Sequence, residues 1–292
     1  MGTAYTPPWK LLNAGHLRPK KALGQNFLVD PSTAEMIIRK SGLTGANVVL
    51  EIGAGLGALT LPLAKKAEFV HAVEKDAAVA AVLERQLRAE AVENVRLCTQ
   101  DVFSVDPGRL CRSSAKRLMV FGNLPYYISS QLLFYLISYR GYIKQADLMF
   151  QKEVARRLKA VPGGKSYGRL SVMMQYYAEI RRTAAVGAHL FWPVPQVDAE
   201  VLQFRFKFQP APGLSDPDLF AAVVKAAFGK RRKTLHNALG SSELGLLPGE
   251  LDCVFAQSGI DPRCRAETLS VEQFARLANT VFACRDKRGG RT

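Results

Sequence analysis

The chain has 292 residues, of which 48% are hydrophobic and 22% are charged. This composition is typical of a globular protein with a substantial core, and the length allows one large domain with a smaller one. No apolar run approaches the roughly 18 residues that a membrane helix needs, and the first ten residues lack the apolar region of a signal peptide. These features argue against a membrane or secreted protein, and we expect a cytoplasmic one.

The charge balance is strongly basic, because 40 Lys and Arg residues stand against 25 Asp and Glu and give a formal net charge of +15. Such an excess favours a nucleic-acid partner, since neutralising phosphates releases condensed counterions. Simple solubility, an acidic protein or a membrane surface are the alternatives. The 5 cysteines include no CxxC pair, which indicates reduced thiols and no structural zinc, and no metal site is predicted.

The predicted elements begin after residues 1–22, a Pro- and Gly-interrupted segment that we expect to be a mobile basic arm. A helix is predicted over residues 31–40, with Asp30 as N-cap and Pro31 at the first helical position. Buried strands and helices then alternate, which predicts an α/β fold with a doubly wound, Rossmann-like parallel sheet. The predicted strands are 47–52, 69–73, 94–98, 118–121, 147–150 and the alternating, half-buried 201–208, and the helices between them include 77–89 and 131–139.

The composition changes at residues 209–217 (QPAPGLSDP), which read as a linker. Beyond it only helical patterns occur, at residues 218–228, 234–239, 251–258 and 271–284. The sequence therefore predicts an N-terminal arm (1–22), an α/β domain (23–208), a linker (209–217) and a small all-α C-terminal domain (218–292).

A glycine-rich loop with Gly53, Gly55 and Gly57 connects the first predicted strand to a helix. Glycines let the backbone turn tightly and approach a ligand closely, but a lone loop of this kind also occurs in NAD enzymes. Two details favour S-adenosyl-L-methionine. The third glycine comes one residue earlier than in the dinucleotide fingerprint, and Glu51 precedes the loop, where a sulfonium cofactor needs an acceptor for its ammonium group.

Two further carboxylates follow predicted strands. Glu74 ends the second strand, where it could accept both ribose hydroxyls, and Asp101 follows the third, where it could accept from the cofactor's adenine amine. Either residue alone would be a surface charge. Together they fall at the carboxyl ends of the strands, where open α/β sheets bind ligands.

The tetrapeptide Asn123-Leu124-Pro125-Tyr126 follows the fourth strand. An adenine N6 amine is a poor nucleophile because its lone pair is delocalised, and two acceptors on its hydrogens would draw it toward tetrahedral geometry. The Asn123 side-chain oxygen and the Leu124 carbonyl could be these acceptors, with Pro125 fixing the backbone and Tyr126 offering a stacking face. Catalysis would rest on positioning and oriented dipoles, without a strong base. The alternative is a plain turn.

The sequence resembles the ribosomal RNA adenine dimethyltransferase family, in particular the bacterial enzymes that act on small-subunit RNA. The resemblance runs nearly the whole length. It rests on residues 23–28 (LGQNFL), 49–53 (VLEIG) with 59–60, 121–126 (FGNLPY) with 128–129, 150–155 (FQKEVA), 168–172 (GRLSV), 191–198 (FWPVPQVD) and 231–235 (RRKTL).

The resemblance implies a class I methyltransferase that dimethylates two adjacent adenines in a hairpin near the 3′ end of small-subunit ribosomal RNA. It further implies a monomer that acts on an assembling 30S particle. We expect cofactor contacts from Gln25, Asn26, Leu28, Gly53, Gly55, Glu74, Lys75, Asp101, Val102 and Asn123, with Phe191 and Tyr126 holding the flipped target base between them. Departures from the family pattern at residues 186–188, Gln196 and Ala199 are expected beside the target-base pocket.

Basic clusters are predicted to contact RNA phosphates, which position RNA without reading its sequence. They comprise Arg18, Lys20 and Lys21, then Lys152, Arg156, Arg157 and Lys159, and finally residues 230–233 (KRRK) in the C-terminal domain. Any one cluster alone would more often be a solvated face.

Four rival functions remain at this point. They are macrolide-resistance methylation of large-subunit RNA, DNA adenine methylation, a methyltransferase fold used only as an assembly or transcription factor, and a nicotinamide dehydrogenase. The RRKTL segment disfavours the first rival. The single proline of the tetrapeptide disfavours the second, whose motif usually has two, and the intact set of Gly53, Glu74, Asp101 and Asn123 disfavours the third. The dehydrogenase leaves the tetrapeptide unexplained.

Overall fold

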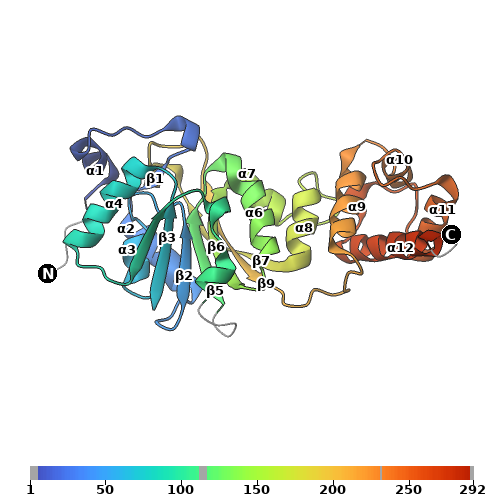
Figure 1. Ribbon diagram of the computed structural model, residues 1–292. Coiled ribbons are helices and arrows are strands. Elements are labelled where there is room, and N and C mark those ends of the chain that lie inside the picture. The colour runs from blue at the N-terminus through green and yellow to red at the C-terminus, as the bar shows by residue number, and fades with distance from the viewer. Residues whose placement is uncertain (1–5, 112–116, 231, 290–292) are drawn as a thin grey trace. The chain divides into compact units, whose positions relative to one another are not determined.

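The computed structural model describes residues 6–111, 117–230 and 232–289, apart from the side chains of Tyr126 and of residues 287–289. The chain forms two compact units, whose elements are labelled in Figure 1. Unit 1 comprises Met1–Ala155 and Glu179–Phe206, and unit 2 comprises Arg156–Ala178 and Lys207–Thr292. The sequence pattern placed residues 156–178 in the α/β domain, whereas the structure groups them with the C-terminal helices.

The core of unit 1 is a seven-stranded sheet in the order β4-β3-β2-β5-β6-β9-β7. Strands β2 to β6 pair in parallel, while β9 is antiparallel to β6. The sequence predicted a wholly parallel sheet, whereas the observed sheet is mixed. Its strands are β2 (Val48–Ile52), β3 (Phe69–Glu74), β4 (Val95–Thr99), β5 (Leu118–Asn123), β6 (Ile143–Gln151), β7 (Ala178–Val186) and β9 (Ala199–Phe206).

Strands β2, β3 and β5 are largely apolar on both faces, as expected for central strands that are covered on both sides. All five residues of β2 are buried, and Val70, Val120 and Phe121 are completely inaccessible. The predicted strands are confirmed in place. The alternating 201–208 segment is not half-buried, because β9 lies inside the sheet between β6 and β7, and all but one of its residues are buried.

The predicted helices of unit 1 are confirmed with small shifts at their ends. Asp30 caps α2 (Pro31–Ser41) by accepting from the Thr33 amide at 2.9 Å, as its position predicted. The other helices are α3 (Thr60–Ala64), α4 (Ala77–Ala89), α5 (Pro107–Leu110) and α6 (Ser129–Ser138), and α7 (Lys152–Leu158) runs across the division between the units. Short 3₁₀ turns occur at Lys21–Leu23, Val102–Ser104, Tyr126–Ile128 and Ala188–Leu190.

Residues 6–22 contain helical structure where the sequence predicted a mobile arm, and residues 1–5 of that arm lie outside the described residues. Residues Pro8–Ala14 form α1, and Leu12 is only 1% exposed because it packs in a small apolar cluster that includes Phe27, Leu56 and Val79. Further along, Phe27–Leu28 form β1, which pairs antiparallel with β8 (Phe191–Trp192) in a separate two-stranded sheet.

Apart from Ala178, the first residue of β7, the regular structure described in unit 2 is helical, and the helices predicted beyond residue 217 are confirmed with shifted ends. Unit 2 contains α8 (Arg169–Tyr177), α9 (Pro217–Gly229), α10 (Leu235–Gly240), α11 (Pro248–Ser258) and α12 (Val271–Gly289), with a 3₁₀ turn at Ala266–Thr268. Aromatic pairs hold its core, with ring centroids 4.8 Å apart for Tyr176 and Phe220 and 5.5 Å apart for Phe228 and Phe274.

Membrane-spanning helices and metal-binding clusters are both absent from the described residues. No helix there has the length and apolarity needed to cross a membrane. The same part of the chain brings together no group of three or more His, Cys, Asp or Glu side chains that could hold a metal ion.

Candidate active site

The glycine loop after β2 has the backbone geometry that requires glycine. Gly53, Gly55 and Gly57 have φ angles of 72°, 55° and 87°, a region that L side chains rarely adopt. The tight turn brings the Gly55 amide within 2.9 Å of Glu74 Oε2, on the neighbouring strand. The loop is thereby fixed to the carboxyl end of β3.

Glu74 is held by two backbone amides. Oε2 accepts from Gly55, and Oε1 accepts from the Asp76 amide at 2.9 Å. The side chain is largely buried, and this burial raises its pKa despite the two hydrogen bonds. Each carboxylate oxygen still has one lone pair for a further donor. Glu74 is therefore able to accept hydrogen bonds from two ribose hydroxyls, as predicted.

Glu51 is more deeply buried, at 1% exposure. Burial, together with the nearby Glu74 charge, raises the pKa of Glu51 to about 8. Within the described part of the chain its Oε2 has no hydrogen-bond partner. A buried acceptor without a donor is costly, and it is suited to a ligand that brings a cation or an N–H group.

Asp101 lies beyond the end of β4 and forms an ion pair with Lys75, whose Nζ is 2.8 Å from Oδ2. The Phe103 amide donates to Oδ1 at 3.0 Å. The hydrogen bond from Lys75, followed by the one from Phe103, lowers the pKa of Asp101. The carboxylate is therefore ionised and oriented. Asp101 and its neighbour Val102 line a cavity together with Glu74.

Asn123 ends β5, beside the glycine loop. Its Nδ2 donates to the Asn26 carbonyl at 2.9 Å. An amide has one donor end and one acceptor end, so this bond leaves Oδ1 as the end available to a ligand. Leu124 follows with its side chain buried, and the Pro125 carbonyl accepts from the Ser129 hydroxyl at 3.2 Å.

Phe191 reaches the site through the pairing of β8 with β1, in which Leu28 lies opposite Phe191. The side chain is 4% exposed and lines the same cavity as Asn123 and Leu124. Its predicted partner Tyr126 has a side chain outside the described residues, so the pairing of the two rings around a base stays a prediction.

A single cavity of about 570 Å³ joins these groups. Its lining contains every predicted site residue whose side chain is described: Gln25, Asn26, Leu28, Gly53, Gly55, Glu74, Lys75, Asp101, Val102, Asn123, Leu124, Pro125 and Phe191. Of the departures from the family pattern, Ala199 also lines it and Gln196 is exposed. The size fits a nucleoside-sized ligand, and the unpartnered Glu51 oxygen fits the ammonium group of S-adenosylmethionine.

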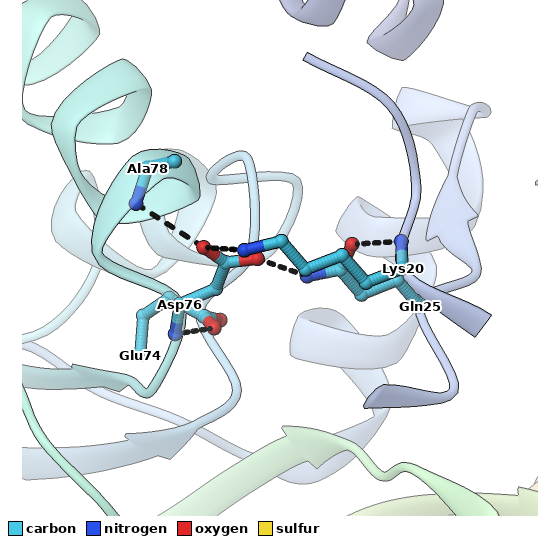
Figure 2. Close-up of polar contacts among 5 residues, drawn as sticks. All are labelled: Lys20, Gln25, Glu74, Asp76 and Ala78. Atoms are coloured by element: carbon cyan, nitrogen blue, oxygen red, sulfur yellow. Dashed lines mark hydrogen bonds and ion pairs between the residues drawn. The ribbon is translucent and has the colours of Figure 1, made fainter. Parts of the chain in front are cut away.

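Three site features were missed from the sequence. Asp76 was not singled out, yet it accepts from both Lys20 and Gln25 (Figure 2). Its position before a helix signals a cap, but nothing local reveals donors more than fifty residues away. Lys20 donates its ammonium hydrogen to Asp76, which the sequence did not predict, and its predicted phosphate contact stays a prediction. Tyr127, 59% exposed, lines the cavity near Lys75.

The described residues of the basic clusters are exposed, apart from Lys159, which is half-buried. Arg18, Lys152 and Arg156 face solvent, as do Lys230, Arg232 and Lys233, whereas Arg231 lies outside the described residues. Lys230 also donates to the Ser241 hydroxyl at 2.8 Å. Their exposure permits phosphate contacts, which remain a prediction.

Comparison with known proteins identifies the family. The profile of the family described as "Ribosomal RNA adenine dimethylase" matches residues 16–282. This chain belongs to the ribosomal RNA adenine dimethylase family. The predicted family, the α/β methyltransferase fold with a helical C-terminal region, the enzyme class and the cofactor S-adenosyl-L-methionine are confirmed.

Curated relatives match the dimethylase over almost its full length. "Ribosomal RNA small subunit methyltransferase A" of Desulforapulum autotrophicum is 46% identical over 95% of this chain and 97% of its own. The protein of the same name from Moorella thermoacetica is 43% identical over 91% of this chain and 93% of its own.

Solved structures support the same fold. A dimethyladenosine transferase from Plasmodium falciparum superimposes with a TM-score of 0.70 at 26% identity, covering 86% of this chain and 95% of its own. The 23S rRNA methyltransferase ErmE gives a TM-score of 0.66 at 24% identity, covering 88% of this chain and 100% of its own. The latter likeness bears on the fold alone.

Proposed function

We propose that this dimethylase transfers methyl groups from S-adenosyl-L-methionine to the N6 amines of two adjacent adenines in a hairpin near the 3′ end of small-subunit ribosomal RNA. The observation that carries the proposal is the orientation of Asn123. Because its Nδ2 is bound to the Asn26 carbonyl, its Oδ1 faces the ligand as an acceptor. An acceptor is what a target amine requires.

The cofactor roles follow from the chemistry of the three acids. Glu51, buried and without a donor of its own on Oε2, accepts from the ammonium group. Glu74, fixed by two backbone amides, accepts from the ribose hydroxyls. Asp101, oriented by Lys75 and Phe103, accepts from the cofactor's adenine amine. The walls of the cofactor site are formed by Asn26, Leu28, Gly53, Gly55 and Val102. Gln25 donates to the Asp76 carboxylate, and Lys75 donates to the Asp101 carboxylate.

Bound S-adenosylmethionine supplies an electrophilic methyl group on a sulfonium centre. The chain's own residues position the amine that attacks it. Asn123 Oδ1 and the Leu124 carbonyl accept the two amine hydrogens, and Pro125 keeps the Leu124 backbone extended. Phe191 and Tyr126 hold the base between them. The proton lost from the methylated amine leaves to solvent, so positioning supplies most of the rate enhancement.

The small-subunit substrate is proposed from the relatives at 46% and 43% identity, whose names specify that subunit. We further propose that the enzyme acts as a monomer on the assembling 30S particle in the cytoplasm, as a step of ribosome biogenesis. The helical unit 2 and the exposed basic clusters would hold the RNA backbone, consistent with the net charge of +15.

The proposal is tested with Asn123→Ala. We expect loss of methyl transfer to undermethylated small subunits by about 100-fold or more, the scale seen when an oriented catalytic dipole is removed. Binding of S-adenosylhomocysteine, measured by calorimetry, should change far less. Retained transfer would contradict the role of Asn123, and retained RNA binding without any transfer by the wild type would favour an assembly factor.

A further inference from the structure

Asp76 collects more donors than a helix cap needs. It precedes α4 and accepts from the Ala78 amide at 3.2 Å, which is the capping bond. Its Oδ1 also accepts from Lys20 Nζ, and its Oδ2 accepts from Gln25 Nε2, both at 2.9 Å (Figure 2). The Asp76 side chain is 2% exposed and that of Lys20 is 53% exposed, so a buried carboxylate anchors a partly exposed N-terminal segment.

The ionic state of Asp76 agrees with this arrangement. Burial alone would raise the pKa of Asp76, but the hydrogen bonds from Lys20, Gln25 and the Ala78 amide, together with the Lys20 charge, outweigh burial and lower it. Gln25 is bound at both ends of its side chain, because its Oε1 accepts from the Lys20 amide at 2.8 Å. The three side chains thus form a closed network that fixes the backbone on both sides of the turn at Lys21–Leu23.

This network connects two parts of the candidate site, Glu74 at the end of β3 and the segment around Asn26. On one side, the Asp76 amide donates to Glu74 Oε1. On the other, Gln25 is followed by Asn26, whose carbonyl accepts from Asn123. A Cβ built on Gly55 would come within 3.4 Å of the Phe27 ring, so the same segment lies against the glycine loop.

We propose that Asp76 is a positioning residue that, through Lys20 and Gln25, holds residues 20–28 against the cofactor cavity and so sets both cofactor affinity and the orientation of Asn123. Asp76 touches neither substrate nor cofactor in this role, and it acts through Gln25, Asn26 and Glu74. The inference rests on the proposed assignment of the cavity to S-adenosylmethionine.

The competing explanation is that Asp76 only caps α4. Asp76→Ser separates the two, because serine is a comparable N-cap but is too short to reach both Lys20 and Gln25. Lys20→Met removes the cation while leaving the cap untouched. Asp216→Ser is the matched control, since Asp216 caps α9 in unit 2 through the Asp218 and Leu219 amides.

The experiment has two readouts on the full chain. In the cofactor-free protein, hydrogen exchange should become faster over residues 20–28 in Asp76→Ser and Lys20→Met, while α4 stays protected. S-adenosylhomocysteine binding should weaken by about 10-fold in both variants, as expected for the loss of charge-assisted hydrogen bonds. Asp216→Ser should match the wild type in both respects.

Wild-type affinity and exchange in Asp76→Ser would overturn the proposal. The proposal would also be overturned if Asp76→Ser weakened binding with faster exchange only in α4, while Lys20→Met behaved as the wild type. That result would show that Asp76 acts only as a helix cap. Glu74→Ala is measured in parallel. If Glu74→Ala binds S-adenosylhomocysteine as the wild type does, the cofactor-site assignment itself fails, and that outcome is distinct from a failure at Asp76.

Discussion

The side-chain amide of Asn123 donates a 2.9 Å hydrogen bond to the main-chain carbonyl of Asn26, 97 positions earlier in the chain. This bond decides which end of the amide faces the cavity. It also makes the N-terminal segment part of the catalytic geometry rather than a separate arm.

Asn123→Asp tests this relationship because it changes the donor into an acceptor with little change in shape. A carboxylate oxygen opposite the Asn26 carbonyl has no hydrogen to donate, so the side chain should rotate or repel the segment. We expect kcat to fall by about 100-fold or more, measured as methyl transfer at saturating cofactor. Activity within a few-fold of the wild type would contradict the assigned orientation.

The raised pKa of Glu51 predicts that replacing this residue with glutamine stabilises the fold while weakening cofactor binding. Its folded-state pKa of about 8 lies above its ordinary value of 4.5, so the folded protein retains a proton that the unfolded chain releases. The stabilising contribution of this proton is full below pH 4.5 and is lost as pH rises through about 8.

Glu51→Gln keeps the side chain neutral at every pH. Its free energy of unfolding should exceed that of the wild type increasingly from pH 5 to 8, by on the order of a few kcal/mol at the upper end. S-adenosylhomocysteine binding should nevertheless weaken by about 10-fold or more, because a charge-assisted hydrogen bond is lost. Urea unfolding across this pH range and calorimetry test the pair, and a variant that binds normally would remove Glu51 from the site.

Gly122 is predicted to be intolerant of a side chain. A Cβ there would lie 2.8 Å from the Ile52 carbonyl oxygen and 3.0 Å from Leu124 Cδ2, and the carbonyl belongs to the backbone of the paired strand. Gly122→Ala should destabilise the protein by about 1–3 kcal/mol and displace Asn123, lowering methyl transfer beyond the loss of folded protein. Gly141→Ala, with open space around its Cβ, is the control and should be near neutral.

Helix α1 is predicted to depend on Leu12. This side chain is 1% exposed within the apolar cluster around Phe27, and Leu→Ala at a fully buried site costs about 2–5 kcal/mol. Because α1 is short and terminal, we expect Leu12→Ala to release it locally, seen as faster hydrogen exchange over residues 8–14. Asn13→Ala, at an exposed position on the same helix, should leave exchange unchanged. Equal behaviour of the two variants would show that Leu12 does not hold the helix.

The parts of the fold that were predictable are those with strong local patterns. The apolar run of β2, the glycine loop and the Asp30-Pro31 helix start each carry their structure in a few adjacent residues. Glu74 at the end of β3 and Asp101 after β4 could be assigned to one crevice because parallel strands end at the same edge of a sheet.

The missed parts depend on contacts between distant segments. Strand β7 carries polar residues such as Arg181 and Arg182 because it lies at the edge of the sheet, and Arg181 donates to Gln203 on β9 at 2.7 Å. Strands β1 and β8 are two residues each and exist only as a pair. Helix α1 was wrongly predicted as part of a mobile arm because Pro7, Pro8, Gly15 and Pro19 interrupt this segment, while the burial of Leu12 depends on residues distant in the sequence.

The most direct measurement of the central claim is transfer of labelled methyl groups from S-adenosylmethionine to undermethylated small ribosomal subunits, with large subunits alongside and the modified nucleoside identified. The account predicts N6,N6-dimethyladenosine in small-subunit RNA, at two adjacent positions, and its loss in Asn123→Ala. Label found only in large subunits, or none in either with RNA binding intact, would contradict it.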